Sequence, residues 1–160
     1  MRLVKLCCTI LPVALFACSD SVGGGSTDVP AVIPIESQTF ATALGVNLAA
    51  STKTADGLYY RDIVVGTGTT ITANHTIAVY YNGYLPNGAG FDSVVVAPAF
   101  QTLIGTGAVI KGWDEGIVGM KVGGTRQLII PSALGYGVSG NGPIPPNANL
   151  VFKVTVVSTT

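Results

Sequence analysis

Five runs of β-branched and aromatic residues, separated by turn residues, constrain the fold of this chain more than any other feature. The runs are Leu58–Gly66, Thr76–Leu85, Phe100–Gly105, Thr125–Pro131 and Leu150–Ser158. Such runs between glycine, proline and asparagine are typical of β-strands. One stretch among them, Val109–Met120, instead places its apolar residues on one face of a helix. The pattern predicts an α+β fold, in which a five-stranded antiparallel sheet wraps around one short helix.

The length and composition indicate one domain with appendages. The chain has 160 residues, of which 21 are Gly and 9 are Pro, and only 10% are charged. That length supports one hydrophobic core rather than two, and the glycine and proline content indicates many turns. The formal net charge is zero, and no run of Lys or Arg is present. Because neutralisation of phosphates drives nucleic-acid binding, we expect no nucleic-acid partner.

The first residues have the composition of an export signal. Arg2 and Lys5 precede a largely apolar stretch, Leu6–Ala17, which is too short to span a bilayer. It runs into "LFAC", Leu15–Cys18, which resembles the lipobox of bacterial lipoproteins. The resemblance implies a signal peptide over residues 1–17 and a lipidated Cys18, and Ser19 favours the outer membrane, facing the periplasm. The alternative is an ordinary secretory signal with a chance cysteine.

Two segments connect this N-terminus to the strand-rich region. Residues 18–38 are rich in Gly, Ser, Asp and Pro. They have too little apolar surface to offset their backbone entropy, so we expect a flexible tether. In residues 39–56, Phe40, Leu44 and Leu48 recur every four residues and predict a short helical arm, followed by a linker. Residues 57–160 would then form the folded domain.

Side chains that usually carry catalysis or bind metals are scarce. His75 is the single histidine, and Cys18 is the single cysteine beyond the export signal. These cannot assemble a zinc or haem site, and we expect neither a metal nor a cofactor. Asp114 and Glu115 adjoin, but successive helical residues point in different directions and make no acid/base pair. The glycine clusters lack the lysine that a phosphate-binding loop needs.

Three long motifs lie in the strand-rich region. They are "VYYNGYLPNGAGFDS" (79–93), "VIKGWDEGIVGMKVGGTRQLIIP" (109–131) and "LGYGVSGNGPIPPNANLVFKV" (134–154). In order and nearly in spacing they resemble the FKBP-type peptidyl-prolyl cis-trans isomerases, from about Gly57 to Ser158. The resemblance implies an FKBP-like sheet around one short helix.

The resemblance also implies a site that binds X–Pro segments in an apolar pocket. The catalytic residues that it implies are Tyr81, Phe91, Asp92, Trp113, Tyr136 and Phe152. The substrate-binding residues are Phe100, Val109, Ile110 and Ile144. Trp113 would form the floor beneath the proline ring, and Ile144 would close the pocket as a loop lid. The Ile110 backbone N–H and the Tyr136 hydroxyl would each bond a substrate carbonyl.

The segment Phe91–Phe100 departs from the family pattern. Many members carry an arginine here that pairs with the aspartate, whereas this loop is apolar, with valines at 94, 95 and 96. Asp92 is therefore expected either to be more exposed or to bond to Tyr136. Thr102 stands where a second aromatic often lies, so one wall of the pocket is expected to be wider or more polar.

The resemblance implies an isomerase that assists the folding of exported proteins. Its partners would be proline-containing unfolded polypeptides, macrolide inhibitors and, through the lipid anchor, a membrane. Two other hypotheses stay open. One is a non-catalytic chaperone or peptide-binding module with the same fold. The other is a surface-anchored scaffold, in which neighbouring side chains would bury Tyr81, Trp113 and Tyr136.

Overall fold

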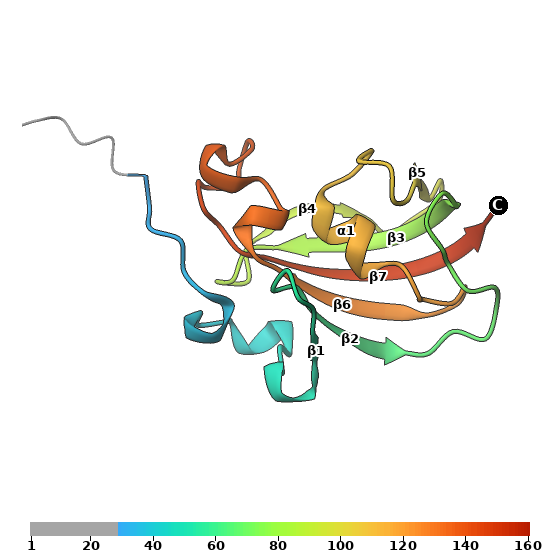
Figure 1. Cartoon of the computed structure of the whole chain (residues 1–160), viewed down its shortest axis with the longest axis horizontal. Coiled ribbons are helices and arrows are strands. Elements are labelled where there is room, and N and C mark those ends of the chain that lie inside the picture. The colour runs from blue at the N-terminus through green and yellow to red at the C-terminus, as the bar shows by residue number, and fades with distance from the viewer. Residues whose placement is uncertain (1–28) are drawn as a thin grey trace, which may run out of the picture.

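The computed structural model describes residues 29–160 and has one antiparallel sheet with a short helix against one face (Figure 1). The strands are β1 Thr52–Lys53, β2 Tyr59–Val64, β3 Thr76–Tyr84, β4 Gly90–Val94, β5 Phe100–Leu103, β6 Thr125–Ile130 and β7 Leu150–Thr159. Their order in the sheet is β1-β2-β6-β7-β3-β4, and β5 also pairs with β3. The predicted signal peptide, Cys18 and the first part of the tether lie outside the described residues.

The α+β class and the antiparallel sheet are confirmed, but the sheet has seven strands rather than the predicted five. The two additional strands are β1 and β4. The sequence did not predict β4 because Gly90, Asp92 and Ser93 are residue types that strands disfavour. The strand forms because it pairs with β3, which places Val94 opposite Tyr81.

The sheet has an apolar cluster on each face. Successive residues of a strand point to opposite faces, so Leu128 and Ile130 of β6 enter the main core with the helix, whereas Ile129 enters a second cluster. In β7, Phe152 belongs to the main core and Val151 to the second cluster. The same two strands therefore supply both clusters.

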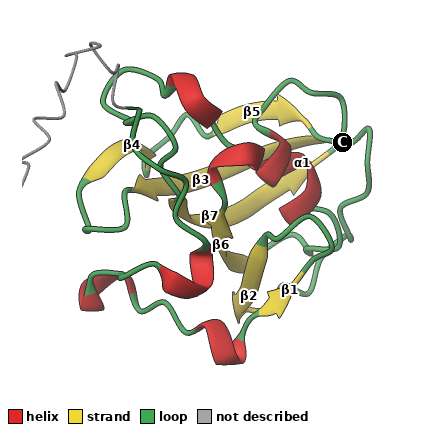
Figure 2. Ribbon diagram, turned by 60° about the vertical axis from the view of Figure 1, so that its left-hand side comes forward, coloured by secondary structure: helices red, strands yellow, loops and turns green. Residues whose placement is uncertain are grey.

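The helix α1, Lys111–Gly116, is shorter than the stretch 109–120 that the sequence predicted, and it lies over the sheet (Figure 2). Two glycines allow it to approach β6 closely. A Cβ atom at Gly112 would lie 2.5 Å from Cγ2 of Ile130, and one at Gly116 would lie 2.7 Å from Cδ2 of Leu128. Gly119, with φ +82°, turns the chain away soon after the helix.

Residues 29–51 form an arm that packs on the second cluster. The arm contains three 3₁₀ turns, Ile35–Ser37, Thr42–Leu44 and Leu48–Ala50, instead of the predicted α-helix. Gly45 has a left-handed φ of +59° and ends the middle turn, which breaks the helical spacing. Ile35 is 3% exposed and contacts the second cluster, so residues 35–38 belong to the folded unit rather than to a flexible tether.

No helix within residues 29–160 combines the length and the apolar character that crossing a membrane requires.

Candidate active site

Aromatic rings of the main core gather around Trp113 in α1. The Trp113 ring centroid lies 5.1 Å from that of Tyr81, 5.4 Å from that of Phe152 and 6.1 Å from that of Phe100, all edge-to-face. Phe91 extends the cluster by packing edge-on against Phe152 at 5.4 Å. Since edge-to-face pairs have a preferred geometry, these contacts hold the indole in one orientation.

A cavity of about 450 Å³ lies against these rings. Its lining residues are Tyr81, Asp92, Phe100, Ala108, Val109, Ile110, Trp113, Tyr136 and Phe152. The volume is that of a small-ligand site, and the lining is mostly apolar with a few polar groups, as such sites require. Tyr81 and Trp113 are buried but face this cavity, and Tyr136 is only half-buried. The scaffold hypothesis, in which the aromatics only fill the core, therefore does not fit.

Three hydrogen-bond donors at the cavity have no partner among residues 29–160. The Ile110 carbonyl accepts a 2.9 Å hydrogen bond from Trp113 N at the start of α1. The Ile110 N–H donates to no group among these residues. The Tyr136 hydroxyl likewise bonds to no described residue, although it lines the cavity. The Trp113 Nε1 is buried without a partner. Unpaired donors in an apolar cavity favour a ligand that brings acceptors.

The Tyr81 hydroxyl donates a 2.6 Å hydrogen bond to Oδ2 of Asp92. Burial, and then this hydrogen bond, raise the pKa of Tyr81 well above its ordinary value, so the hydroxyl stays protonated. Asp92 itself is exposed. Of the two arrangements predicted for Asp92, the bond to Tyr136 does not form, because the partner is Tyr81, and the carboxylate is exposed.

The loop between β5 and α1 is tied to the helix by Asp114. Its two carboxylate oxygens accept hydrogen bonds from Gly105 N and Gly107 N, each at 2.8 Å. These bonds fold the loop back onto α1. Ala108 and Val109, which follow the loop, are thereby placed at the edge of the cavity.

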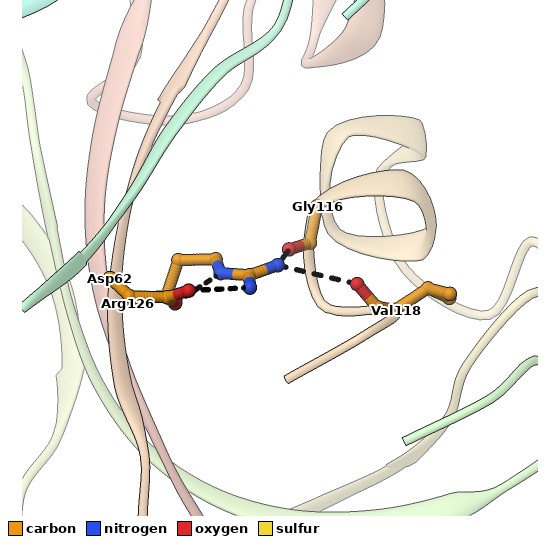
Figure 3. A network of polar contacts seen from close by, with 4 residues as sticks. All are labelled: Asp62, Gly116, Val118 and Arg126. Carbon is orange, nitrogen blue, oxygen red and sulfur yellow. Dashed lines mark hydrogen bonds and ion pairs between the residues drawn. The ribbon is translucent and has the colours of Figure 1, made fainter. Parts of the chain in front are cut away.

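A buried arginine of β6 holds the other end of α1 (Figure 3). Arg126 Nη1 donates to the carbonyls of Gly116 at 2.9 Å and Val118 at 3.3 Å. Its Nε and Nη2 atoms donate to the two carboxylate oxygens of Asp62 at 2.7 and 3.0 Å. Carbonyls at a helix C-terminus lack partners within the helix, so Arg126 satisfies that of Gly116, the last residue of α1, and also that of Val118 in the turn beyond it. The network fixes α1, and with it Trp113, relative to β2 and β6.

The cavity brings together most of the predicted site residues, with two exceptions. Phe91 packs against Phe152 and does not line the cavity. Ile144 is 6% exposed, belongs to the main core and does not line the cavity. Asn141 and Ile144 exchange two backbone hydrogen bonds of 2.9 Å, and this tight turn directs Ile144 inward. Ala108 lines the cavity without having been predicted, because a methyl group carries no distinguishing chemistry.

Fold and cavity together define a class: an α+β domain whose aromatic cavity is suited to binding an apolar ligand that brings hydrogen-bond acceptors. The chain belongs to the FKBP-type peptidyl-prolyl cis-trans isomerase family, whose model matches residues 68–157. The domain is thus a peptidyl-prolyl cis-trans isomerase domain of FKBP type, as the sequence motifs predicted.

Individual relatives match a little under two thirds of the chain. The chain is 47% identical over 103 residues to the "FK506-binding protein" of Neisseria meningitidis serogroup B, covering 63% of this chain and 94% of that protein. It is 50% identical over 103 residues to "FK506-binding protein 4" of Dictyostelium discoideum, covering 64% of this chain but only 28% of that protein. The chain therefore spans little more than a quarter of the length of that relative.

A solved structure confirms the fold. The crystal structure of AtFKBP13 superposes with a TM-score of 0.64 at 36% sequence identity, covering 69% of this chain and 98% of that one. The FKBP-like antiparallel sheet with a short helix, which the motifs predicted, is therefore correct.

Proposed function

We propose that this protein catalyses cis-trans isomerisation of X–Pro bonds in the aromatic cavity, and that it thereby assists the folding of exported proteins. Its substrates are proline-containing unfolded polypeptides. The observation that carries the proposal is the cavity of about 450 Å³, which has Trp113 in its lining and unpaired donors beside it. Membership of the isomerase family supports the same reaction.

The reaction suits a cavity without a nucleophile. An X–Pro bond prefers trans by only about 0.5–1 kcal/mol but rotates over a barrier of roughly 18–20 kcal/mol, because the C–N bond has partial double-bond character. The planar amide has the more polarised carbonyl, so removing water from it favours the twisted amide of the transition state. Each tenfold acceleration needs about 1.4 kcal/mol. No proton is transferred and no covalent bond is broken.

The lining residues divide this work. Trp113 provides the surface on which the proline ring lies, with Tyr81 and Phe152 beside it at 5.1 and 5.4 Å. The unpaired Ile110 N–H donates to one substrate carbonyl, and the Tyr136 hydroxyl donates to a second. Together these donors hold the chain on both sides of the rotating bond, so that binding energy is available to the twisted state.

The test is proline-limited refolding of an unfolded protein, which takes tens of seconds or more without a catalyst. Wild type is expected to shorten this phase, and Trp113→Leu is expected to lose at least about tenfold in kcat/KM, for a loss of about 1.4 kcal/mol in transition-state binding. Because Trp113 is also a core residue, circular dichroism must show that the variant is folded.

A second candidate is a non-catalytic chaperone with the same fold. The observation that favours it is the exposed apolar loop beside the cavity, where Val95 is 57% and Val96 is 72% exposed. Wild type that binds unfolded chains without shortening the proline phase would establish this function instead.

The cavity is also proposed to bind FK506, the ligand in the name of the Neisseria relative. Support comes from the 47% identity to this relative over 103 residues. FK506 is expected to inhibit isomerisation competitively with a proline peptide. Inhibition that excess peptide does not relieve would contradict a shared cavity.

The location of the protein is a further part of the proposal. We infer that Cys18 is lipidated after removal of residues 1–17 and anchors the chain in the outer membrane, facing the periplasm. The support is the sequence "LFAC" at Leu15–Cys18 and the Ser19 that follows it. Mass spectrometry of the membrane fraction is expected to find acylated Cys18 as the first residue. An unmodified Cys18 would contradict the anchor.

A further inference from the structure

The loop between β4 and β5, residues 95–99, protrudes beside the cavity. β3 pairs with β5 up to Val79, opposite Phe100, and with β4 from Tyr81, opposite Val94. The loop therefore leaves the sheet opposite Tyr81 and returns to it opposite Val79. These two positions of β3 are two residues apart, which is about 7 Å along a strand. The loop cannot continue the sheet over so short a span and must project from it. Tyr81 and Phe100, which lie at this junction, both line the cavity.

The surface of this loop is apolar. Val95 is 57% exposed, Val96 is 72% exposed and Phe100, at its end, is 37% exposed. The segment 94–100 reads "VVVAPAF" and contains no charged or hydrogen-bonding side chain. We call Val95, Val96 and Phe100 the valine rim. Several exposed apolar side chains within one short segment favour a contact surface.

We propose that the valine rim is a second contact site for the substrate polypeptide. The rim binds apolar side chains of the substrate that flank the proline in the cavity. This inference rests on the proposed function. The substrate chain has to enter and leave the cavity, and Phe100 belongs to both the cavity lining and the rim. A residue two or three positions from the proline lies within about 7–11 Å of it. Such a residue reaches the rim.

The chemistry of the rim selects the substrate class. A leucine, valine or phenylalanine of the substrate removes its own apolar surface and that of the valines from water, which is favourable. A charged or amide side chain finds no partner on residues 94–100 and loses part of its hydration. The preferred substrates are therefore prolines within apolar segments, which are buried in folded proteins and exposed in unfolded ones.

The experiment compares two decapeptides with the same central Ala-Pro bond. One carries leucine and valine on both sides of that bond, and the other carries serine and glutamine. Isomerisation is measured by NMR exchange, which needs no protease. Wild type is expected to show a KM about tenfold lower for the apolar peptide, since burial of about half a leucine side chain has this effect. The variant Val95→Ser/Val96→Ser is expected to lose this difference while its KM for the polar peptide stays unchanged.

A matched control lies toward the opposite edge of the sheet. Val64 and Val65 at the end of β2 are 52% and 72% exposed, and β6 and β7 separate β2 from β3. The variant Val64→Ser/Val65→Ser removes the same two side chains at similar exposure and is expected to keep the wild-type preference. Equal KM values of wild type for both peptides, or equal loss in the two variants, would overturn the proposal.

Two further outcomes are distinguishable. If wild type isomerises neither peptide, the proposed function itself is wrong and the inference fails with it. If the rim joins two copies of this chain, light scattering will show a dimer in wild type that Val95→Ser/Val96→Ser abolishes, with both KM values unaltered. That result would also overturn the substrate site.

Discussion

Two tyrosines at the cavity differ in how their hydroxyls are used. The Tyr81 hydroxyl is committed to Asp92 at 2.6 Å, whereas the Tyr136 hydroxyl has no partner among residues 29–160. The first hydroxyl therefore contributes to the stability of the free protein, and the second is available to a ligand. The same substitution at the two positions should separate these effects.

We expect Tyr136→Phe to lower kcat/KM about 2- to 10-fold without changing the free energy of unfolding, since one hydrogen bond contributes about 0.5–1.5 kcal/mol. Tyr81→Phe is expected to lower the free energy of unfolding by about 1 kcal/mol, because the Asp92 carboxylate loses its partner. Steady-state kinetics and urea unfolding measure the two quantities. A loss of stability in Tyr136→Phe would show that its hydroxyl is structural.

Individual site residues were predictable to different degrees. Trp113, Tyr81 and Tyr136 could be assigned because large aromatics within extended motifs are specific. The partner of Asp92 could not be assigned, because the pairing of Gly83 with Asp92 across β3 and β4 sets which side chains meet. Ile144 was misplaced since its direction depends on a backbone turn rather than on its own chemistry.

At the level of helices and strands, the close packing of α1 on β6 depends on Gly112, which has no side chain. Gly112→Ala is expected to destabilise the protein by about 1–3 kcal/mol, as overpacking does, because Ile130 is fully buried and cannot yield. Gly90→Ala is a suitable control, since a Cβ there meets nothing closer than 3.7 Å. Thermal unfolding measures both. Equal stability of the two variants would mean that α1 can move away from the sheet.

The ion pair behind α1 is expected to matter more than the one on the arm. Asp62→Asn leaves the guanidinium of Arg126, whose side chain is 7% exposed, without its counter-charge. We expect a loss of about 1–3 kcal/mol, less than for a fully buried pair because Asp62 is 36% exposed. Glu36→Gln, whose partner Lys53 is 51% exposed, should lose less stability than Asp62→Asn at neutral pH, because solvent screens an exposed pair. Urea unfolding of the two variants tests this order.

Strands were predictable from the sequence where residue type and pattern agreed. β3 alternates buried and less buried residues along its length, and β7 does so from Phe152 to Val157. The bounds of both strands lie within one residue of the prediction. The arm was not predictable from its helical spacing, because Leu44 and Leu48 pack on the second cluster from two separate 3₁₀ turns and Phe40 packs on it from the segment before them. Tertiary contact with the second cluster replaced the local preference of these residues.

In the molecule as a whole, the arm closes the face of the sheet opposite the cavity. Side chains of the domain hold it by its backbone: Asn149 Nδ2 donates to Ile33 O at 2.7 Å, and Gln127 Nε2 donates to Leu44 O at 2.7 Å. Glu36 adds hydrogen bonds from Lys53 Nζ at 2.5 Å and from the Tyr59 hydroxyl at 2.6 Å. The arm is therefore part of the cooperative unit.

These contacts predict a dependence of stability on pH. The bond from Lys53, and then that from Tyr59, lower the pKa of Glu36 from 4.5 to about 2. Because the pKa of Glu36 is lower in the folded protein than its value of 4.5 in the unfolded chain, ionised Glu36 stabilises the fold at pH values above 4.5. This contribution is lost as the pH falls toward 2. Wild type should therefore lose more stability than Glu36→Gln between about pH 5 and pH 2. Parallel urea-unfolding profiles of the two proteins would contradict the assignment.

The two-sided use of β6 and β7 has a consequence for how such a protein can change over generations. The effects on stability of substitutions in separate clusters with no shared partners are additive. The second cluster can therefore keep the fold stable while residues around the cavity vary. The apolar loop at residues 95–99 beside the cavity is one place for such variation. Substitutions in this loop can change which ligands bind without lowering the stability of the fold.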